Sequence, residues 1–259
     1  MYRNMISLPD FTHSPIDIHS HFNHGAKADC PEDNIHLRGM DFIESVYCNS
    51  GVAQVGVSTY ASVLDTGCIL EENEYLHRLI DEKVWVYQWV VVDPRQKDTY
   101  VQAEKMLSHP KVLGIKLQPQ SHGYDILDYA EELFAFAHHH RTVLLVHPQR
   151  RSDRLAVFAN KYPDMKLIIA HLGAEDHIEA VANAVHGNIY VDTSGAASSR
   201  NNVLEYAVQR VGSEKILFGT DTYAYPFQFG RIALSALSFE KKENILWKNA
   251  VRLFPDAFR

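Results

Sequence analysis

The sequence lacks most features of disulfide-bonded and membrane-inserted proteins. Only three of its 259 residues are cysteines, and Cys30, Cys48 and Cys68 form no CxxC pair, which argues against a disulfide framework. No segment approaches the roughly 20 apolar residues that a membrane helix needs. The opening residues, MYRNMISLPDF, contain no apolar stretch of signal-peptide length. We therefore expect a soluble, cytoplasmic protein with reduced thiols.

The chain also lacks the charge balance and glycine-rich motifs of proteins that bind phosphates. It has 25 Lys and Arg against 32 Asp and Glu, a formal net charge of −7, so it offers no basic surface for nucleic acid or an anionic membrane. Neither GxGxxG nor GxxxxGK followed by Ser or Thr occurs, which argues against a nucleotide-binding open sheet. The expected partner is a small-molecule substrate, with no nucleic acid and no membrane.

Short β-branched runs recur along the chain and alternate with segments of helical apolar spacing, clearest over residues 130–137, 178–185 and 203–211. Several runs are apolar without interruption, as expected of parallel strands covered on both faces. The eight runs begin near Ile16, Val52, Val84, Val112, Val143, Leu167, Ile189 and Ile216. Eight β-then-α units and a hydrophobic fraction of 46% predict an α/β fold, a single-domain (β/α)8 TIM barrel over residues 1–259.

Polar side chains follow five of these runs, at the end of the barrel where such folds place their active sites. His19 and His21 are one residue apart, so on a strand both imidazoles point the same way and can bind one ion. His147 and Asp221 end two later runs and complete a set of three nitrogens and one carboxylate. This set favours zinc, although it also suits manganese, iron(II), cobalt or nickel. We predict a divalent metal centre with one ion or two.

Other polar residues of the predicted barrel mouth have several interpretations. Lys116 follows the fourth run and fits three roles equally well: a barrel lysine paired with Asp221 or Asp17, a substrate anchor, or a carbamylated bridge between two metal ions. His24 and His122 lie after the first and fourth runs and are within reach of a substrate, although most such histidines are ordinary loop residues. Residues 138–140, three histidines, end a predicted helix and are interpreted as structural.

Seven segments together resemble the amidohydrolase superfamily, and within it the amidohydrolase-related (amidohydrolase 2) group of TIM-barrel metal-dependent hydrolases. The resemblance covers nearly the whole chain. Its segments are DIHSH (17–21), GIKLQP (114–119), LLVHP (144–148), LIIAHLG (167–173), YVDTSG (190–195), ILFGTDTYAYP (216–226) and NILWKNAVRLF (244–254).

The resemblance implies roles for particular residues. His19, His21, His147 and Asp221 would be metal ligands, and His171 would be an electrophile, an acid–base group or a ligand of a second metal. Lys116 occupies a place similar to that of the carbamylated lysine of some members. The GTDTYAYP segment is longer than the expected GTD-x-P form, and Tyr223 and Tyr225 within it are expected to shape the substrate pocket together with His24.

Three functions compete at this point. The first is a hydrolase in which a metal-activated water attacks a carbonyl, with Asp221 moving the proton and His171 stabilising the oxyanion. The second is a non-oxidative decarboxylase of an aromatic or unsaturated acid, which needs a cationic clamp such as Lys116, Arg150 or Arg151. The third, a non-catalytic metal-binding scaffold, is disfavoured because it needs none of these residues together. Barrels of this kind often form homodimers, but no segment indicates an interface.

Overall fold

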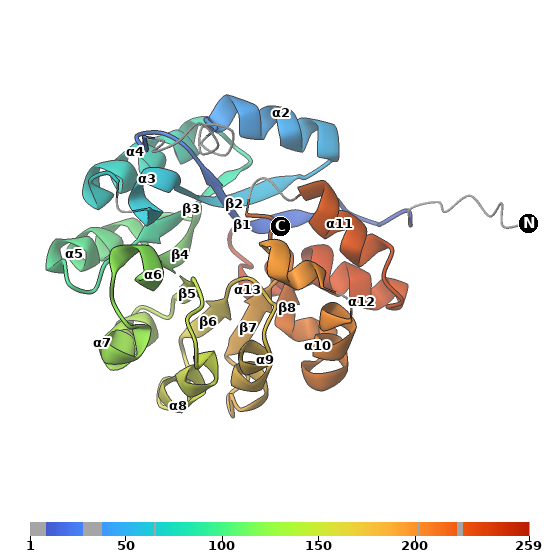
Figure 1. Cartoon of the computed structure of the whole chain (residues 1–259). Helices are drawn as coiled ribbons and strands as arrows, with labels where there is room; N and C mark the ends of the chain where they lie inside the picture. Colours follow the sequence, from blue (N-terminus) through green and yellow to red (C-terminus); the bar gives the residue numbers. More distant parts are fainter. Residues whose placement is uncertain (1–8, 28–37, 65, 201, 222–224, 259) are drawn as a thin grey trace, which may run out of the picture.

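Eight parallel strands follow one another in chain order around a central ring (Figure 1). The computed structural model describes residues 9–27, 38–64, 66–200, 202–221 and 225–258. The strands are β1 (Ile16–Phe22), β2 (Gln54–Thr59), β3 (Val86–Val91), β4 (Val112–Leu117), β5 (Val143–Val146), β6 (Lys166–Ile169), β7 (Ile189–Asp192) and β8 (Ile216–Leu217). The predicted TIM barrel is confirmed, and each strand begins within two residues of its predicted start.

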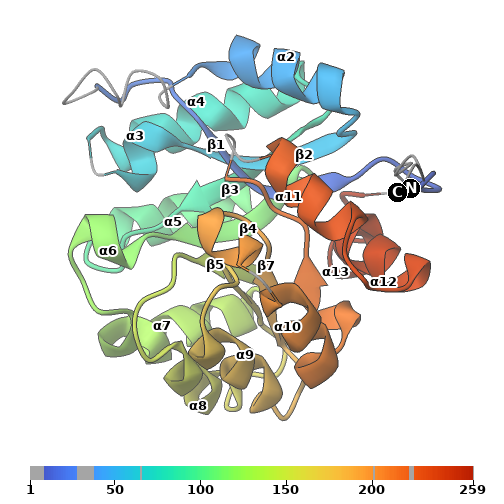
Figure 2. The ribbon, with the colours of Figure 1, turned by 45° about the vertical axis from the view of Figure 1, so that its right-hand side comes forward.

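Helices cover the outside of the strands in both views of the ribbon (Figures 1 and 2). They are α2 (Met40–Ser50), α3 (Tyr60–Val63), α4 (Ile69–Glu82), α5 (Lys97–Met106), α6 (Pro119–His122), α7 (Ile126–His139), α8 (Leu155–Ala159), α9 (Glu175–Ala182), α10 (Val203–Val211), α11 (Tyr225–Ala233), α12 (Phe239–Glu243) and α13 (Asn249–Leu253). The helical spacing predicted over residues 178–185 runs past the helix, because α9 ends at Ala182 and Val185 is 75% exposed. No helix in the described part of the chain is long and apolar enough to cross a membrane.

Backbone hydrogen bonds join the last strand to the first. The amide of Ile18 donates to the carbonyl of Phe218 at 3.0 Å, and the amide of Asp221 donates to the carbonyl of His19 at 2.9 Å. These bonds close the barrel at the seam between β8 and β1. They also fix Asp221, four residues after the end of β8, beside His19 of β1.

Two apolar layers result from the alternation of side chains along the strands. One layer packs between strands and helices; the other fills the barrel, where Trp89 packs edge-on against Phe254, and Phe254 against Phe258. The indole of Trp89 donates to the carbonyl of Ile18 at 2.7 Å, and a Cβ on Gly56 would lie only 2.9 Å from the indole nitrogen. Because the interior is filled, polar chemistry is confined to the mouth of the barrel.

A β-bulge between Asp17 and Ser20 changes which side chains of β1 face inward. Ile18 packs in the barrel interior and His19 contacts Lys116 there, whereas the carboxylate of Asp17 accepts hydrogen bonds from Tyr47 of α2 and from Thr220. Of the two carboxylates considered as partners of Lys116, Asp17 is therefore not its neighbour, whereas the charge of Asp221 does act on the lysine. The extra residue of the bulge turns Asp17 towards the helix layer and away from the lysine.

Candidate metal centre

His19 and His21 converge at the mouth end of β1. Their Nε2 atoms lie 3.2 Å apart, and the two residues are only 1% and 5% exposed. The two-residue spacing after the bulge therefore directs both imidazoles to one point, as the HxH pattern predicts.

Asp221 supplies a carboxylate to the same point. Its Oδ1 atom lies 3.4 Å from His21 Nε2 and 3.9 Å from His19 Nε2. The ligand atoms of these three residues all lie within 4.8 Å of one another. The backbone of Asp221 has a φ of 58°, a left-handed conformation that is uncommon outside glycine and that clusters at functional sites.

The Nδ1 atoms of His19 and His21 each contact a neighbouring polar side chain. His19 Nδ1 donates to Asp192 Oδ2 at 2.9 Å, and His21 Nδ1 lies 2.9 Å from the hydroxyl of Ser58. Because the Asp192 carboxylate only accepts hydrogen bonds, His19 carries its proton on Nδ1, and its Nε2 is the acceptor. This carboxylate–histidine pairing is the usual support of a metal-binding imidazole.

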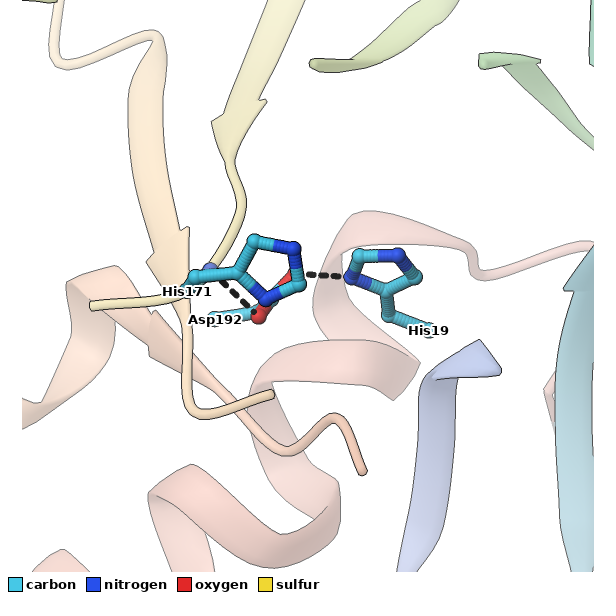
Figure 3. Close-up of side chains that lie close together, drawn as sticks. All are labelled: His19, His171 and Asp192. Atoms are coloured by element: carbon cyan, nitrogen blue, oxygen red, sulfur yellow. Dashed lines mark hydrogen bonds and ion pairs between the residues drawn. The ribbon is translucent and has the colours of Figure 1, made fainter. Parts of the chain in front are cut away.

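Asp192 also orients His171, the histidine that follows β6 (Figure 3). The backbone amide of His171 donates to Asp192 Oδ1 at 3.1 Å, and its Nδ1 lies 2.9 Å from the hydroxyl of Ser194. His171 has a φ of 59°, and a Cβ on Gly195 would lie 2.7 Å from its Nδ1. His19, His171 and Asp192 form a second group of closely spaced donor atoms, but His19 Nδ1 is already engaged by Asp192, so we interpret this group as hydrogen-bonded support.

His147 connects to these groups through His171. Its Nδ1 lies 3.1 Å from His171 Nε2, and its Nε2 donates to the side-chain oxygen of Gln120 at 3.2 Å. Neither group of closely spaced donor atoms includes it. Its role as a metal ligand stays a prediction.

Lys116 is the buried cation of the site. It is 1% exposed, and its Nζ donates to His19 Nε2 at 2.8 Å. Burial lowers the pKa of Lys116 to about 8, opposed by the charges of Asp221 and Asp192. Positive charge therefore sits beside the predicted metal ligands.

The protonation states of the predicted ligands favour metal binding. Burial lowers the pKa of His147 to about 3 and the pKa of His21 well below its usual value, so both imidazoles are neutral at pH 7. Burial would raise the pKa of Asp221, but the facing histidines and Lys116 outweigh it and lower this pKa to about 2. Neutral imidazoles and an ionised carboxylate are the forms that bind a metal ion.

The other predicted substrate residues have varied surroundings. His24 stacks on Tyr75 with ring centroids 3.4 Å apart, and its Nδ1 lies 3.0 Å from Glu72 Oε1. His122 is buried, and its Nε2 donates to the carbonyl of Ser62 at 2.8 Å, which is a structural contact. Tyr223 and the side chain of Tyr225 lie outside the described residues.

Sequence reasoning missed the residues that support the ligands. Asp192 stands in the YVDTSG segment at the end of β7, and its place at a strand end was the available signal. Ser58 is the second-last residue of β2 in an ordinary QVGVST run, and Gln120 lies in the short helix α6; nothing in their sequence context marks them.

Residues 16–255 match a protein-family model described as Amidohydrolase, Amidohydro_2. The chain belongs to this amidohydrolase family. No curated protein matches the sequence.

Solved structures share the fold at low sequence identity. A 2,6-dihydroxybenzoate decarboxylase from Rhizobium has 14% identity and a TM-score of 0.74, with 94% of this chain and 99% of that chain covered. A manganese-bound dihydroxybenzoic acid decarboxylase from Polaromonas sp. JS666 has 17% identity and a TM-score of 0.71, covering 94% and 97%. A zinc-bound amidohydrolase from Burkholderia multivorans has 16% identity and a TM-score of 0.70, covering 93% and 99%.

Proposed function

We propose that the protein is a metal-dependent hydrolase that cleaves an amide, lactone or ester bond of a small molecule. His19, His21, Asp221 and His147 would hold a divalent ion, zinc before manganese. The observation that carries the proposal is the separation of 3.2 to 3.9 Å among His19 Nε2, His21 Nε2 and Asp221 Oδ1. Ligand bonds of about 2.1 Å at tetrahedral angles place donor atoms about 3.4 Å apart, so the three atoms fit one ion.

A bound divalent ion supplies Lewis acidity, which polarises a carbonyl and lowers the pKa of water from about 15.7 to about 7. Residues of the chain transfer the proton and stabilise the developing charge. Asp221, ionised at neutral pH, accepts a proton from the attacking water and returns it to the leaving group. His171, oriented by Asp192 and Ser194, donates a hydrogen bond to the negative charge that develops on the carbonyl oxygen.

The second candidate is non-oxidative decarboxylation of an aromatic or unsaturated acid. Two observations favour it: the buried ammonium of Lys116 offers a carboxylate a cation inside the mouth, and two of the similar structures are named as decarboxylases. Of the other two predicted clamps, Arg151 lies 3.4 Å from Asp125 at an exposed position, and Arg150 lines a separate cavity. Lys116 is therefore the clamp that this candidate requires.

One assay separates the candidates. Protein loaded with Zn²⁺ or Mn²⁺ is incubated with a panel of lactones, amides, esters and hydroxybenzoates, and both acid release and carbon dioxide release are measured. The proposal predicts metal-dependent acid release that the His19→Ala/His21→Ala variant lacks. Carbon dioxide release alone would replace it with the second candidate, and no turnover of either kind would favour the scaffold hypothesis. The predicted homodimer is checked separately by light scattering.

A further inference from the structure

A cluster of four buried polar side chains lies behind the predicted metal ligands, on the side of the strands that faces the helices. Asp17 and Ser20 belong to β1, Tyr47 belongs to α2, and Thr220 directly precedes Asp221. The four residues are at most 2% exposed. Burying a carboxylate and three hydroxyls costs free energy unless they are hydrogen-bonded, and the proposed reaction uses none of the four.

One oxygen of the Asp17 carboxylate joins the two segments that carry predicted ligands. Oδ1 accepts a hydrogen bond from the backbone amide of His19 at 3.1 Å and from the backbone amide of Thr220 at 3.2 Å. His19 is itself a predicted ligand, and Thr220 is the neighbour of Asp221 in the chain. A single oxygen atom therefore fixes the backbone on both sides of the seam between β8 and β1.

The second oxygen of Asp17 holds the carboxylate in its orientation. Oδ2 accepts from the hydroxyl of Tyr47 at 2.5 Å and from the hydroxyl of Thr220 at 2.6 Å. The hydroxyl of Tyr47 also lies 2.8 Å from that of Ser20. Hydrogen bonds to an ionised group are stronger than those between neutral groups, so these contacts tie α2 to β1 and leave the carboxylate little freedom to turn.

The β-bulge in β1 makes this arrangement possible. In a regular strand, side chains two residues apart face the same side, so Asp17 would lie beside His19. The shift of register between Asp17 and Ser20 turns Asp17 towards the helix layer instead, while His19 contacts Lys116 in the barrel. Bulges often re-aim a side chain next to an active site.

Asp221 needs support of this kind because its backbone is left-handed, with a φ of 58°. A residue other than glycine keeps this conformation only where its surroundings enforce it. The amide of Asp221 donates to the carbonyl of His19 at 2.9 Å, and the amide of Thr220 donates both to that carbonyl and to Asp17. Asp17 thus contributes to the contacts that hold Asp221 Oδ1 3.4 Å from His21 Nε2.

We propose that Asp17 is a positioning residue of the metal centre. Its carboxylate ties the backbone of His19 to that of Thr220 and so sets the separation between His19 Nε2 and Asp221 Oδ1, while Tyr47 fixes the carboxylate from α2. The role is geometric, because it requires an oxygen that accepts both amides and does not require the negative charge. The assignment rests on the metal centre of the proposed function and deepens it by adding a residue that acts through the ligands.

Two substitutions separate this geometric role from an effect of charge. Asp17→Asn removes the charge but keeps an oxygen that can accept from both amides, and its NH₂ group then faces hydroxyls that can rotate to accept. Asp17→Ala removes the acceptor altogether. The affinity of EDTA-treated protein for Zn²⁺, measured by competition with a chelating dye, is expected to fall about 10- to 100-fold in Asp17→Ala, the usual range for residues that support metal ligands. Asp17→Asn should stay close to wild type.

A matched variant and a spectroscopic signature separate positioning from a general loss of stability. Asn73 of α4 is 2% exposed, and its side chain accepts from the amide of Val91 and donates to the Val91 carbonyl, each at 2.9 Å, so it fixes the backbone of β3 in a similar way. Asn73→Ala should lower the free energy of unfolding in urea but leave the Zn²⁺ affinity and the visible absorption of the Co²⁺-loaded protein unchanged. Asp17→Ala should alter that absorption, because the ligand geometry changes, whereas Asp17→Asn should retain it.

Tyr47→Phe provides a milder test that keeps the aromatic ring in the core. It removes the hydroxyl that fixes Asp17 Oδ2, so the Co²⁺ absorption should change in the same direction as in Asp17→Ala, with a smaller loss of affinity. If Asp17→Ala does not fold, wild-type affinity and absorption in Tyr47→Phe would overturn the proposal.

Three results for folded variants would also contradict it. Asp17→Ala could keep the affinity and absorption of wild type, Asp17→Asn could lose as much affinity as Asp17→Ala, which would assign the effect to charge, or Asn73→Ala could lose as much as Asp17→Ala. A wild type that binds neither Zn²⁺ nor Co²⁺ would overturn the metal centre together with this assignment. Because the readouts are binding and absorption, failure of the proposed hydrolysis alone would leave the result intact.

Discussion

The two sides of the barrel mouth differ in how tightly their polar residues are held. On the side of β1, β7 and β8, His19, Asp192 and Ser194 are buried and hydrogen-bonded to one another. On the side of β5 and β6, His147 is partly exposed and Arg150 lies at a cavity. The first side therefore holds its polar groups in a fixed geometry, whereas the second leaves His147 and Arg150 more accessible.

Removing the carboxylate of Asp221 should have the largest effect on turnover. Asp221→Asn keeps the shape of the residue but removes the base, so turnover should fall by about 10³-fold while metal is partly retained. Steady-state kinetics of the metal-loaded variant measures the change. Near-normal turnover would show that Asp221 moves no proton.

Weakening the hydrogen bond between His19 and Asp192 should have a smaller effect than removing a metal ligand. Asp192→Asn leaves an amide that holds the imidazole proton poorly, and the affinity for the metal should fall about 10- to 100-fold. Ser58→Ala, which removes the weaker partner of His21, is the matched variant and should lower the affinity less. Competition with a chelating dye measures both, and an effect of Ser58→Ala larger than that of Asp192→Asn would refute the order.

Sequence patterns predicted the strand order and the residues that lie at strand ends, because β-branched runs and the HxH spacing are local signals. They did not predict the bulge in β1, which depends on the register between β1 and β2 and turns Asp17 away from Lys116. The partners Ser58 and Gln120 were also missed, since each acts through a contact between segments far apart in the chain. Long-range register and side-chain contacts leave no local pattern.

The backbone conformation beside His171 requires glycine at position 195. Gly195 has φ 70° and ψ 166°, a region that is essentially restricted to glycine, and a Cβ there would meet His171 Nδ1 at 2.7 Å. Gly195→Ala should lower the free energy of unfolding by about 1–3 kcal/mol in urea titrations. Gly230→Ala in α11, where a Cβ meets nothing within 4 Å, is the control and should not destabilise the protein.

The smallest effect is a pH dependence of stability in the metal-free protein. Folding lowers the pKa of His147 from its ordinary 6.5 to about 3, so below pH 6.5 the unfolded chain takes up a proton that the folded chain does not. Stability should therefore fall as the pH drops from 6.5 towards 3, by about 1 kcal/mol per pH unit for this histidine. Urea unfolding at pH 7.0 and 5.5 checks this. His147→Ala should reduce the dependence, whereas substitution of the exposed His139 should leave it unchanged.

The metal centre is tested by the metal content of the purified protein, determined by plasma mass spectrometry in wild type and in the His19→Ala/His21→Ala variant. Wild type should contain about one equivalent of zinc or manganese and the variant none, with circular dichroism confirming that both are folded. A wild type that binds no metal after reconstitution, or a variant that keeps its full complement, would contradict the metal centre and the hydrolysis built on it.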